Sequence, residues 1–210
     1  MITKLIILAA GKGTRLRPVT NKIPKCLTPL GSKTILEHQV DTARNAGIKD
    51  IVVVGGYRIN QITLENIKLI ENNKFDSTNM VESLKCASHE FEGGFVLSYA
   101  DIVYQEDILL KMMNSNESIA VACDMDWENY WKERFENPLI DAERFRFDKN
   151  KIIEIGGKAK SLDEIESQYI GLLSFSIHGV NILNEWFSDR YKNENMFIGN
   201  IYLSCTLTSI

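Results

Sequence analysis

The fold is decided near the amino terminus by the stretch Leu5-Ile-Ile-Leu-Ala-Ala-Gly-Lys-Gly-Thr-Arg-Leu16. An unbroken aliphatic run that ends in two alanines is typical of a strand buried on both faces of a parallel sheet. The two glycines allow backbone N–H groups to approach an anion closely, and Lys12 and Arg15 supply positive charge. The stretch therefore predicts a buried strand followed by a phosphate-binding loop.

Two common phosphate-binding loops do not fit this stretch. A dinucleotide-binding fingerprint needs a third glycine where this chain has Leu16, and a Walker A loop needs Lys followed by Ser or Thr after four intervening residues. An ordinary strand-to-helix turn with surface charges is the alternative interpretation of the loop taken alone.

Short apolar runs alternate with amphipathic stretches upstream of Trp127. Strands are expected at 5–10, 51–54, 95–97 and 119–123. Helices are expected over 34–46, over 106–113, and through Ile62, Ile67 and Ile70, with Gly47 ending the first of them. The alternation predicts an α/β fold: a doubly wound, mostly parallel, Rossmann-like sheet with helices on both faces. Further on, residues 145–155 alternate around a turn at 148–150, which predicts a small antiparallel extension.

Composition limits the classes of partner. The chain has 210 residues, a formal net charge of -4 and 44% hydrophobic residues, so one domain over residues 1–210 is expected. The absence of a long basic run argues against nucleic acid and anionic membranes as partners. The four cysteines are far apart without a CxxC pair, so neither a zinc site nor a disulfide framework is expected. A cytoplasmic location is the expectation.

A longer motif gives the loop its specificity. Residues 8–18 read Leu-Ala-Ala-Gly-x-Gly-x-Arg-Leu-x-Pro, and residues 24–27 read Pro-Lys-x-Leu. This combination resembles the nucleotidyltransferases that join a nucleoside monophosphate to a phosphorylated acceptor and release pyrophosphate. The resemblance implies a triphosphate over the loop, with Gly11, Gly13 and Arg15 at the β and γ phosphates. It implies that Lys25 reaches the α-phosphate or the acceptor phosphate. The nucleotide-binding candidates are Leu8, Ala9, Ala10, Gly11, Lys12, Gly13 and Thr14.

Two further segments supply candidates for the base and the metal. The segment 77–84 resembles the helix start beside the nucleobase in cytidylyltransferases, which makes Asn79 and Ser83 base-site candidates; for Glu82 a helix-capping role is the alternative. Asp101 follows a β-rich run, so it is expected at the carboxyl end of a strand, where open α/β sheets bind ligands. By resemblance Asp101 holds Mg²⁺, the expected cofactor. Asp107 is interpreted as an acid favoured in the first turn of a helix.

The segment between residues 126 and 171 resembles bacterial phosphocholine and phosphonate cytidylyltransferases, whose relatives include an enzyme of capsule synthesis that acts on phosphorylated glutamine. Trp127 and Trp131 are candidates for an aromatic wall against an ammonium group, with a place in the core as the alternative. The charged acceptor candidates are Arg134, Asp141, Glu143 and Lys158. Lys158 matches a lysine that contacts the acceptor phosphate in sugar-phosphate relatives, and a solvated turn lysine is its alternative.

These features predict a cytidylyltransferase that transfers CMP from MgCTP to a small amine-bearing phosphate or phosphonate and releases pyrophosphate. The expected acceptors are phosphocholine, 2-aminoethylphosphonate or glutamine phosphate, for capsule or surface-glycan decoration. Lys25, Arg15 and Asp101 are the catalytic candidates, and the three histidines are interpreted as structural. A sugar-1-phosphate nucleotidyltransferase that uses another NTP, and a non-catalytic nucleotide-binding protein, are the alternatives. A second metal-binding carboxylate expected near the end is missing, which favours a truncated chain; a homo-oligomer is left open.

Overall fold

The structure, a computed structural model, describes residues 1–189 and 203–207. The chain divides into two compact units, Met1–Asn114 and Ser115–Ile210. The expected single domain over residues 1–210 stays a prediction, and each unit is described below by itself.

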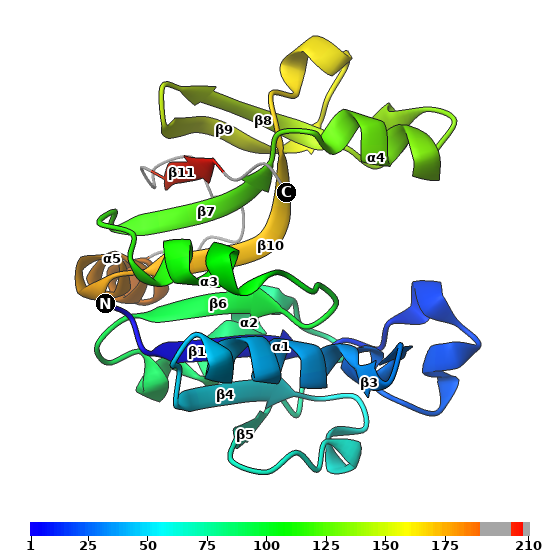
Figure 1. Cartoon of the computed structure of the whole chain (residues 1–210), viewed down its shortest axis with the longest axis vertical. Helices are drawn as coiled ribbons and strands as arrows, with labels where there is room; N and C mark the ends of the chain where they lie inside the picture. Colours follow the sequence, from blue (N-terminus) through cyan, green and yellow to red (C-terminus); the bar gives the residue numbers. More distant parts are fainter. Residues whose placement is uncertain (190–202, 208–210) are drawn as a thin grey trace. The chain divides into compact units, whose positions relative to one another are not determined.

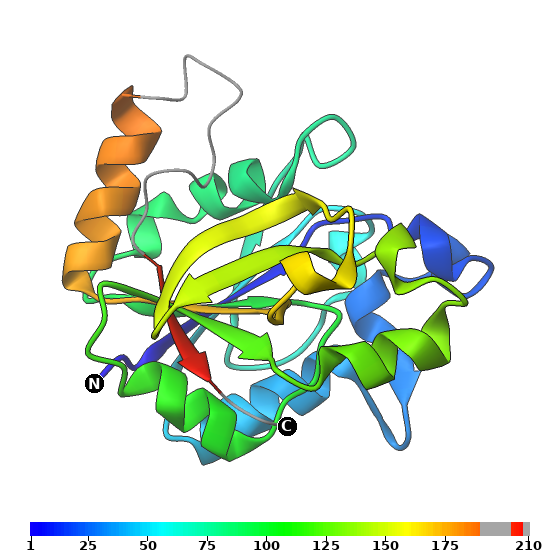
Figure 2. The same ribbon diagram turned by 90° about the horizontal axis from the view of Figure 1, so that it is seen from above.

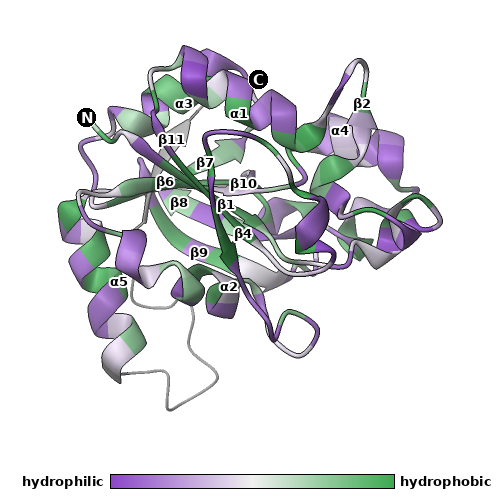
Figure 3. Ribbon diagram, turned by 90° about the horizontal axis from the view of Figure 1, so that it is seen from below, coloured by the Kyte–Doolittle hydropathy of each residue, from purple (hydrophilic) through white to green (hydrophobic). Residues whose placement is uncertain are grey.

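The first unit is built on a parallel sheet with the strand order β5-β4-β1-β6. Its strands are β1 (Lys4–Ala9), β4 (Asp50–Gly55), β5 (Lys68–Glu71) and β6 (Phe95–Tyr99). The central strand β1 pairs in parallel with β4 and β6, so Ala9, Gly55 and Tyr99 end at the same edge. The aliphatic run of β1 is buried, as its sequence predicts, and Figure 3 shows β1 and β4 in hydrophobic green.

Helices cover both faces of this sheet (Figure 1). Helices α1 (Ile35–Asn45) and α3 (Glu106–Met113) pack together on one face, and α2 (Met80–Cys86) lies on the other. Thr34 and Glu37 form a capping box at the start of α1, and Gly47 follows its last turn with a φ of 87°. The expected helices at 34–46 and 106–113 are therefore confirmed. A two-stranded hairpin, β2 (Pro29–Leu30) and β3 (Lys33–Thr34), precedes α1.

The expected helix through Ile62, Ile67 and Ile70 is wrong. Residues Ile59–Gln61 form a single 3₁₀ turn, Asn66 has a φ of 57°, and the chain then enters the edge strand β5, which pairs with β4. Three isoleucines within nine positions fit a helix face, but β-branched residues also favour strands. Hydrogen bonds to the open edge of β4 decide between the two, and these bonds cannot be read from a local pattern.

The second unit has a mixed sheet with the order β10-β7-β11-β9-β8. Its strands are β7 (Ile119–Asp124), β8 (Glu143–Asp148), β9 (Lys151–Lys158), β10 (Gln168–Phe175) and β11 (Leu203–Leu207). The pair β8–β9 is the expected antiparallel hairpin. Helix α4 (Trp127–Arg134) precedes β8, and α5 (Ile177–Asp189) follows β10, as Figure 2 shows in chain colours. The fold is thus the expected α/β fold, a sheet of mostly parallel strands with an antiparallel extension.

The cysteines differ in part from expectation. Cys26 and Cys86 are free, but Cys123 in β7 is disulfide-bonded, which the wide spacing of the cysteines did not predict. In the described residues, no helix is both long enough and apolar enough to cross a membrane.

Candidate active site

The glycine loop leaves β1 at the carboxyl edge of the first unit's sheet. Gly13 has a φ of 59°, which favours glycine, and its carbonyl accepts hydrogen bonds from the Leu16 amide at 3.0 Å and the Thr20 hydroxyl at 2.7 Å. Gly11 and Arg15 are exposed, and a Cβ built on Gly11 meets nothing within 4 Å. The loop therefore has room for an anion beside its backbone.

Lys25 and Asp101 meet at this same edge although 76 residues separate them in the chain. Asp101 follows β6, and the amide of the preceding Ala100 donates to the Leu8 carbonyl of β1 at 3.2 Å. The Lys25 ammonium donates to the Asp101 carboxylate, and each side chain remains about a third exposed, at 34% and 37%. The structure thus brings together two of the three catalytic candidates where ligands are expected.

Lys25 also packs against the loop itself. A Cβ built on Gly13 would lie 2.9 Å from the Lys25 Cβ and 3.1 Å from the Thr20 Cγ2. Only glycine fits there, because both the backbone angle and the space exclude a side chain. The glycine therefore sets how closely the loop approaches the lysine.

The turn after β4 braces the loop from a second side. The Tyr57 hydroxyl and the Arg58 guanidinium both donate to the Asn21 carbonyl, at 2.9 and 3.3 Å. The Tyr57 amide donates to the Ala10 carbonyl at 3.0 Å, and the Lys12 ammonium lies 5.7 Å from the centre of the Phe75 ring. Sequence reasoning missed Tyr57 and Arg58, because nothing in their local pattern indicates contact with the loop.

Cys26 is adjacent to Lys25 but carries no nucleophilic chemistry. Its side chain is 1% exposed, and burial raises the pKa of the thiol to about 12. The thiol is protonated at neutral pH, so the reactive thiolate is not available.

The segment expected beside the base is held by its own hydrogen bonds. The Asn79 side chain caps α2 by accepting from the amides of Val81 and Glu82, at 3.0 and 3.2 Å. The Ser83 hydroxyl accepts from the Asn72 amide group at 3.0 Å, and Asn72 is 3% exposed. Asn79 and Ser83 are therefore structural elements of α2 as well as base-site candidates, and Asn72 is a buried partner that sequence reasoning missed.

The acceptor candidates lie at one end of the β8–β9 hairpin in the second unit. Trp127 is 4% exposed in a cluster with Ala142, Ala159 and Ile165, so the structure places it in the core, the alternative that the sequence left open. Trp131 packs against that cluster, and its Nε1 is buried without a hydrogen-bond partner in the part of the chain that the structure describes. The aromatic wall is thus at most one indole.

The charged acceptor candidates are all exposed. Glu143 and Lys158 are register partners across β8 and β9, and Asp141 follows a short 3₁₀ turn. The Arg134 guanidinium lies 5.2, 5.4 and 5.1 Å from the ring centres of Tyr130, Trp131 and Phe135. The structure therefore makes two groups, Arg134 with Trp131 and Glu143 with Lys158.

Buried Gln168 holds one of these residues. Its side chain accepts from the Glu143 amide at 3.2 Å and donates to the Glu143 carbonyl at 2.6 Å. Gln168 is 4% exposed, and the sequence alone gave no signal for it. The backbone of Glu143 is therefore fixed on both sides, which leaves only its carboxylate to move.

A magnesium ion would have one protein carboxylate at the carboxyl edge of the first unit's sheet. Among the described residues, no group of three or more His, Cys, Asp or Glu side chains could hold a metal. A lone exposed carboxylate fits Mg²⁺, which keeps most of its waters and takes its other ligands from substrate phosphates. Asp101 fits this pattern. The described residues do not offer the cluster of several ligands that a zinc site needs.

Comparison with known proteins identifies the family. The model of the MobA-like NTP transferase domain matches residues 5–147. The chain belongs to this family. It is a nucleotidyltransferase, and it is 38% identical to the CTP:phosphoglutamine cytidylyltransferase of Campylobacter jejuni subsp. jejuni serotype O:2 over 98% of this chain and 87% of the relative.

Two more distant proteins are also similar to this chain. The choline-phosphate cytidylyltransferase of Streptococcus pneumoniae is 33% identical over 49% of this chain and 46% of its own length. The solved structure of the CTP:phosphocholine cytidylyltransferase from Streptococcus pneumoniae superposes with a TM-score of 0.65 at 18% identity, covering 100% of this chain and 92% of that one. At this identity the structural likeness supports the fold alone.

Proposed function

We propose that this nucleotidyltransferase transfers CMP from CTP to a small phosphate or phosphonate that also carries an amine, with release of pyrophosphate. The observation that carries the proposal is the meeting of Lys25 and Asp101 beside the open glycine loop. The similarity to cytidylyltransferases that act on phosphoglutamine and choline phosphate supports CTP as the donor and an amine-bearing acceptor.

Five candidate residues of the first unit have a defined task in the proposed reaction. The backbone of Gly11 and Gly13 and the guanidinium of Arg15 hold the β and γ phosphates. Lys25 exchanges its bond to Asp101 for a phosphate oxygen when CTP binds, which frees the carboxylate. Asp101 would hold Mg²⁺, which would neutralise part of the charge on the phosphates.

The acceptor needs no general base. A phosphate monoester has a second pKa near 6, so an anionic oxygen is already present at neutral pH. The protein then catalyses the transfer by positioning the two substrates and neutralising their charge, which is most of what phosphoryl-type transfer needs from an enzyme. This agrees with the protonated state of the Cys26 thiol, which excludes it as a nucleophile.

The acceptor site is proposed at the hairpin end of the second unit. Lys158 and Arg134 supply cations for the anionic end of the acceptor. Asp141 and Glu143 supply carboxylates for its ammonium group. The exposed positions of all four charges support a site at this place. In this proposal Trp127 supports the site from the core and does not touch the acceptor.

One assay tests the proposal. Purified protein is given Mg²⁺, each of the four ribonucleoside triphosphates or dTTP, and one acceptor at a time, and pyrophosphate release is measured. The acceptors are phosphocholine, 2-aminoethylphosphonate, glutamine phosphate, glucose-1-phosphate and N-acetylglucosamine-1-phosphate. We expect release with CTP and an amine-bearing acceptor. A preference for UTP, GTP or dTTP with a sugar phosphate contradicts the proposal, and CTP binding without turnover would indicate a nucleotide-binding protein.

A further inference from the structure

Gln39 is a polar residue at a buried position where apolar side chains surround it in the sequence of the helix face. It lies on the buried face of α1 with Leu36, Val40 and Ala43, and it is 1% exposed. Its Oε1 is buried and has no hydrogen-bond partner among the residues that the structure describes. A buried acceptor without a partner is unfavourable, so packing alone would favour a leucine or methionine at this position.

The other half of the Gln39 amide is fully used. Nε2 donates to the Tyr99 carbonyl at 2.8 Å and to the Ile102 carbonyl at 2.5 Å. These two carbonyls flank Ala100 and Asp101, so one amide group closes the turn that carries the carboxylate. Both partners are carbonyl oxygens, which only accept, so the donor between them is the NH₂ group and not Oε1 of the Gln39 amide.

We infer that Gln39 is a positioning residue for Asp101: it fixes the turn between Tyr99 and Ile102 so that the carboxylate meets Lys25 in the free protein and the metal once the nucleotide is bound. The inference rests on the proposed function for its link to the metal. Removing a residue that orients a metal ligand without touching the metal typically lowers metal affinity by about 10-fold or more.

The test compares Gln39→Met with Val40→Ala. Methionine keeps the volume and removes both donors, whereas Val40→Ala removes packing from the adjacent position on the same buried face and keeps the Gln39 bonds. Each variant is measured for unfolding midpoint, for the Mg²⁺ concentration that gives half-maximal activity, and for Mn²⁺ bound to the protein–CTP complex by electron paramagnetic resonance. Amide hydrogen exchange over residues 99–104 is measured on the free protein.

We expect Gln39→Met to raise the half-maximal Mg²⁺ concentration and the Mn²⁺ dissociation constant by about 10-fold or more, and to speed exchange over residues 99–104. Val40→Ala should lower the unfolding midpoint without these changes. If both variants lose stability but keep the wild-type metal requirement and exchange, Gln39 is only structural and the inference is overturned. If the wild type and both variants fail to transfer CMP, the proposed function is wrong. The inference can still be judged in that case, because unchanged Mn²⁺ binding and unchanged exchange in Gln39→Met would overturn it.

Discussion

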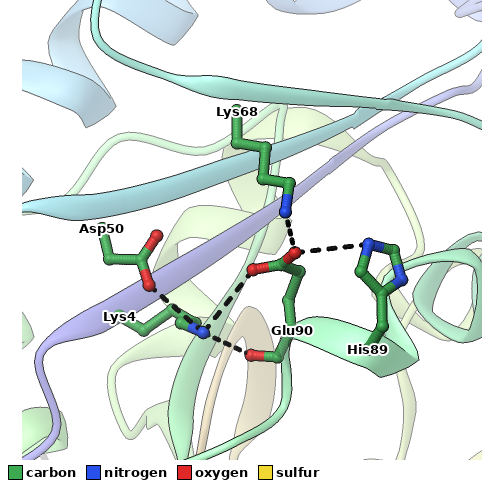
Figure 4. Close-up of polar contacts among 5 residues, drawn as sticks. All are labelled: Lys4, Asp50, Lys68, His89 and Glu90. Atoms are coloured by element: carbon green, nitrogen blue, oxygen red, sulfur yellow. Dashed lines mark hydrogen bonds and ion pairs between the residues drawn. The ribbon is translucent and has the colours of Figure 1, made fainter.

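The two edges of the first unit's sheet treat charge in opposite ways. At the amino edge, Lys4, Asp50 and Lys68 are the first residues of β1, β4 and β5. There Lys4 lies between Asp50 at 3.1 Å and Glu90 at 3.7 Å, and Lys68 pairs with Glu90 (Figure 4). The side chains of Lys4 and Glu90 are only 13% and 11% exposed.

At the carboxyl edge, fewer of the charges are paired. Lys12 and Arg15 are exposed, and the Lys25–Asp101 pair is about a third exposed. The amino-edge cluster is centred on the nearly buried side chains of Lys4 and Glu90, which contribute to stability only when both are paired, whereas unpaired exposed cations beside an open loop are available to a ligand. The difference indicates that paired charges at the amino edge serve folding, and it agrees with the proposed binding role of the less paired charges at the carboxyl edge.

The largest expected effect is at the carboxyl edge. Lys25→Ala and Asp101→Asn should each lower kcat/KM by at least about 100-fold, because in the proposed reaction Lys25 stabilises charge in the transition state and Asp101 holds the metal ion. Stability should change by less than about 1 kcal/mol, since an exposed ion pair contributes little. Steady-state kinetics and thermal unfolding check this. Near-wild-type rates at saturating Mg²⁺ would refute the assigned roles.

A pair of glycine substitutions separates strain from function. Gly13→Ala and Gly31→Ala both place alanine at positive φ, 59° and 66°, so each should cost about 1–2 kcal/mol of stability. Only Gly13→Ala also pushes a Cβ against Lys25, whereas nothing lies within 4 Å at Gly31. Activity should therefore fall about tenfold or more in Gly13→Ala alone. Equal losses of activity in both variants would show that the loop contact does not matter.

The amino edge should respond to pH in stability but not in turnover. The hydrogen bond from Lys68, with help from the charges of Lys4 and His89, holds the pKa of Glu90 below its usual value. Because the folded-state pKa is lowered, the stabilisation is present above the unfolded pKa near 4.5 and is lost as pH falls through the folded value.

Glu90→Gln should therefore destabilise the protein by roughly 1–2 kcal/mol at pH 7 and by much less at pH 3. The measurement is denaturant unfolding at both pH values, with Glu92→Gln, an exposed neighbour, as the control. A change in kcat with Glu90→Gln would contradict the separation of the two edges.

The smallest expected effect is at Tyr57 and Arg58, the two residues that hold the Asn21 carbonyl beside the glycine loop. Tyr57→Phe removes one hydrogen bond to Asn21 and should raise the KM for CTP a few-fold, since such a bond contributes about 0.5–1.5 kcal/mol. Arg58→Ala should act similarly, and the double variant should cost less than the sum, because both groups donate to the same carbonyl. Strict additivity in this cycle would show that the two bonds do not form one brace.

The sequence by itself determined the features whose cause lies within a few neighbouring residues. The aliphatic run of β1, the helix over 34–46 ended by Gly47, the helix over 106–113 and the β8–β9 hairpin follow from local apolar spacing and turn residues, and the structure confirms them. The placement of Asp101 after β6 was also predictable, because an acidic residue that closely follows a β-rich run lies at the edge of the sheet.

Only the tertiary structure decided which distant groups meet. The local spacing of isoleucines in residues 62–70 suggested a helix. Pairing with β4 instead places residues 68–71 in strand β5. The Lys25–Asp101 pair spans 76 residues, and the Gln39 bonds to Tyr99 and Ile102 span 60 and 63. Such contacts leave no periodic trace in the sequence, because they depend on strand order and register, which are set by the packing of the sheet as a whole.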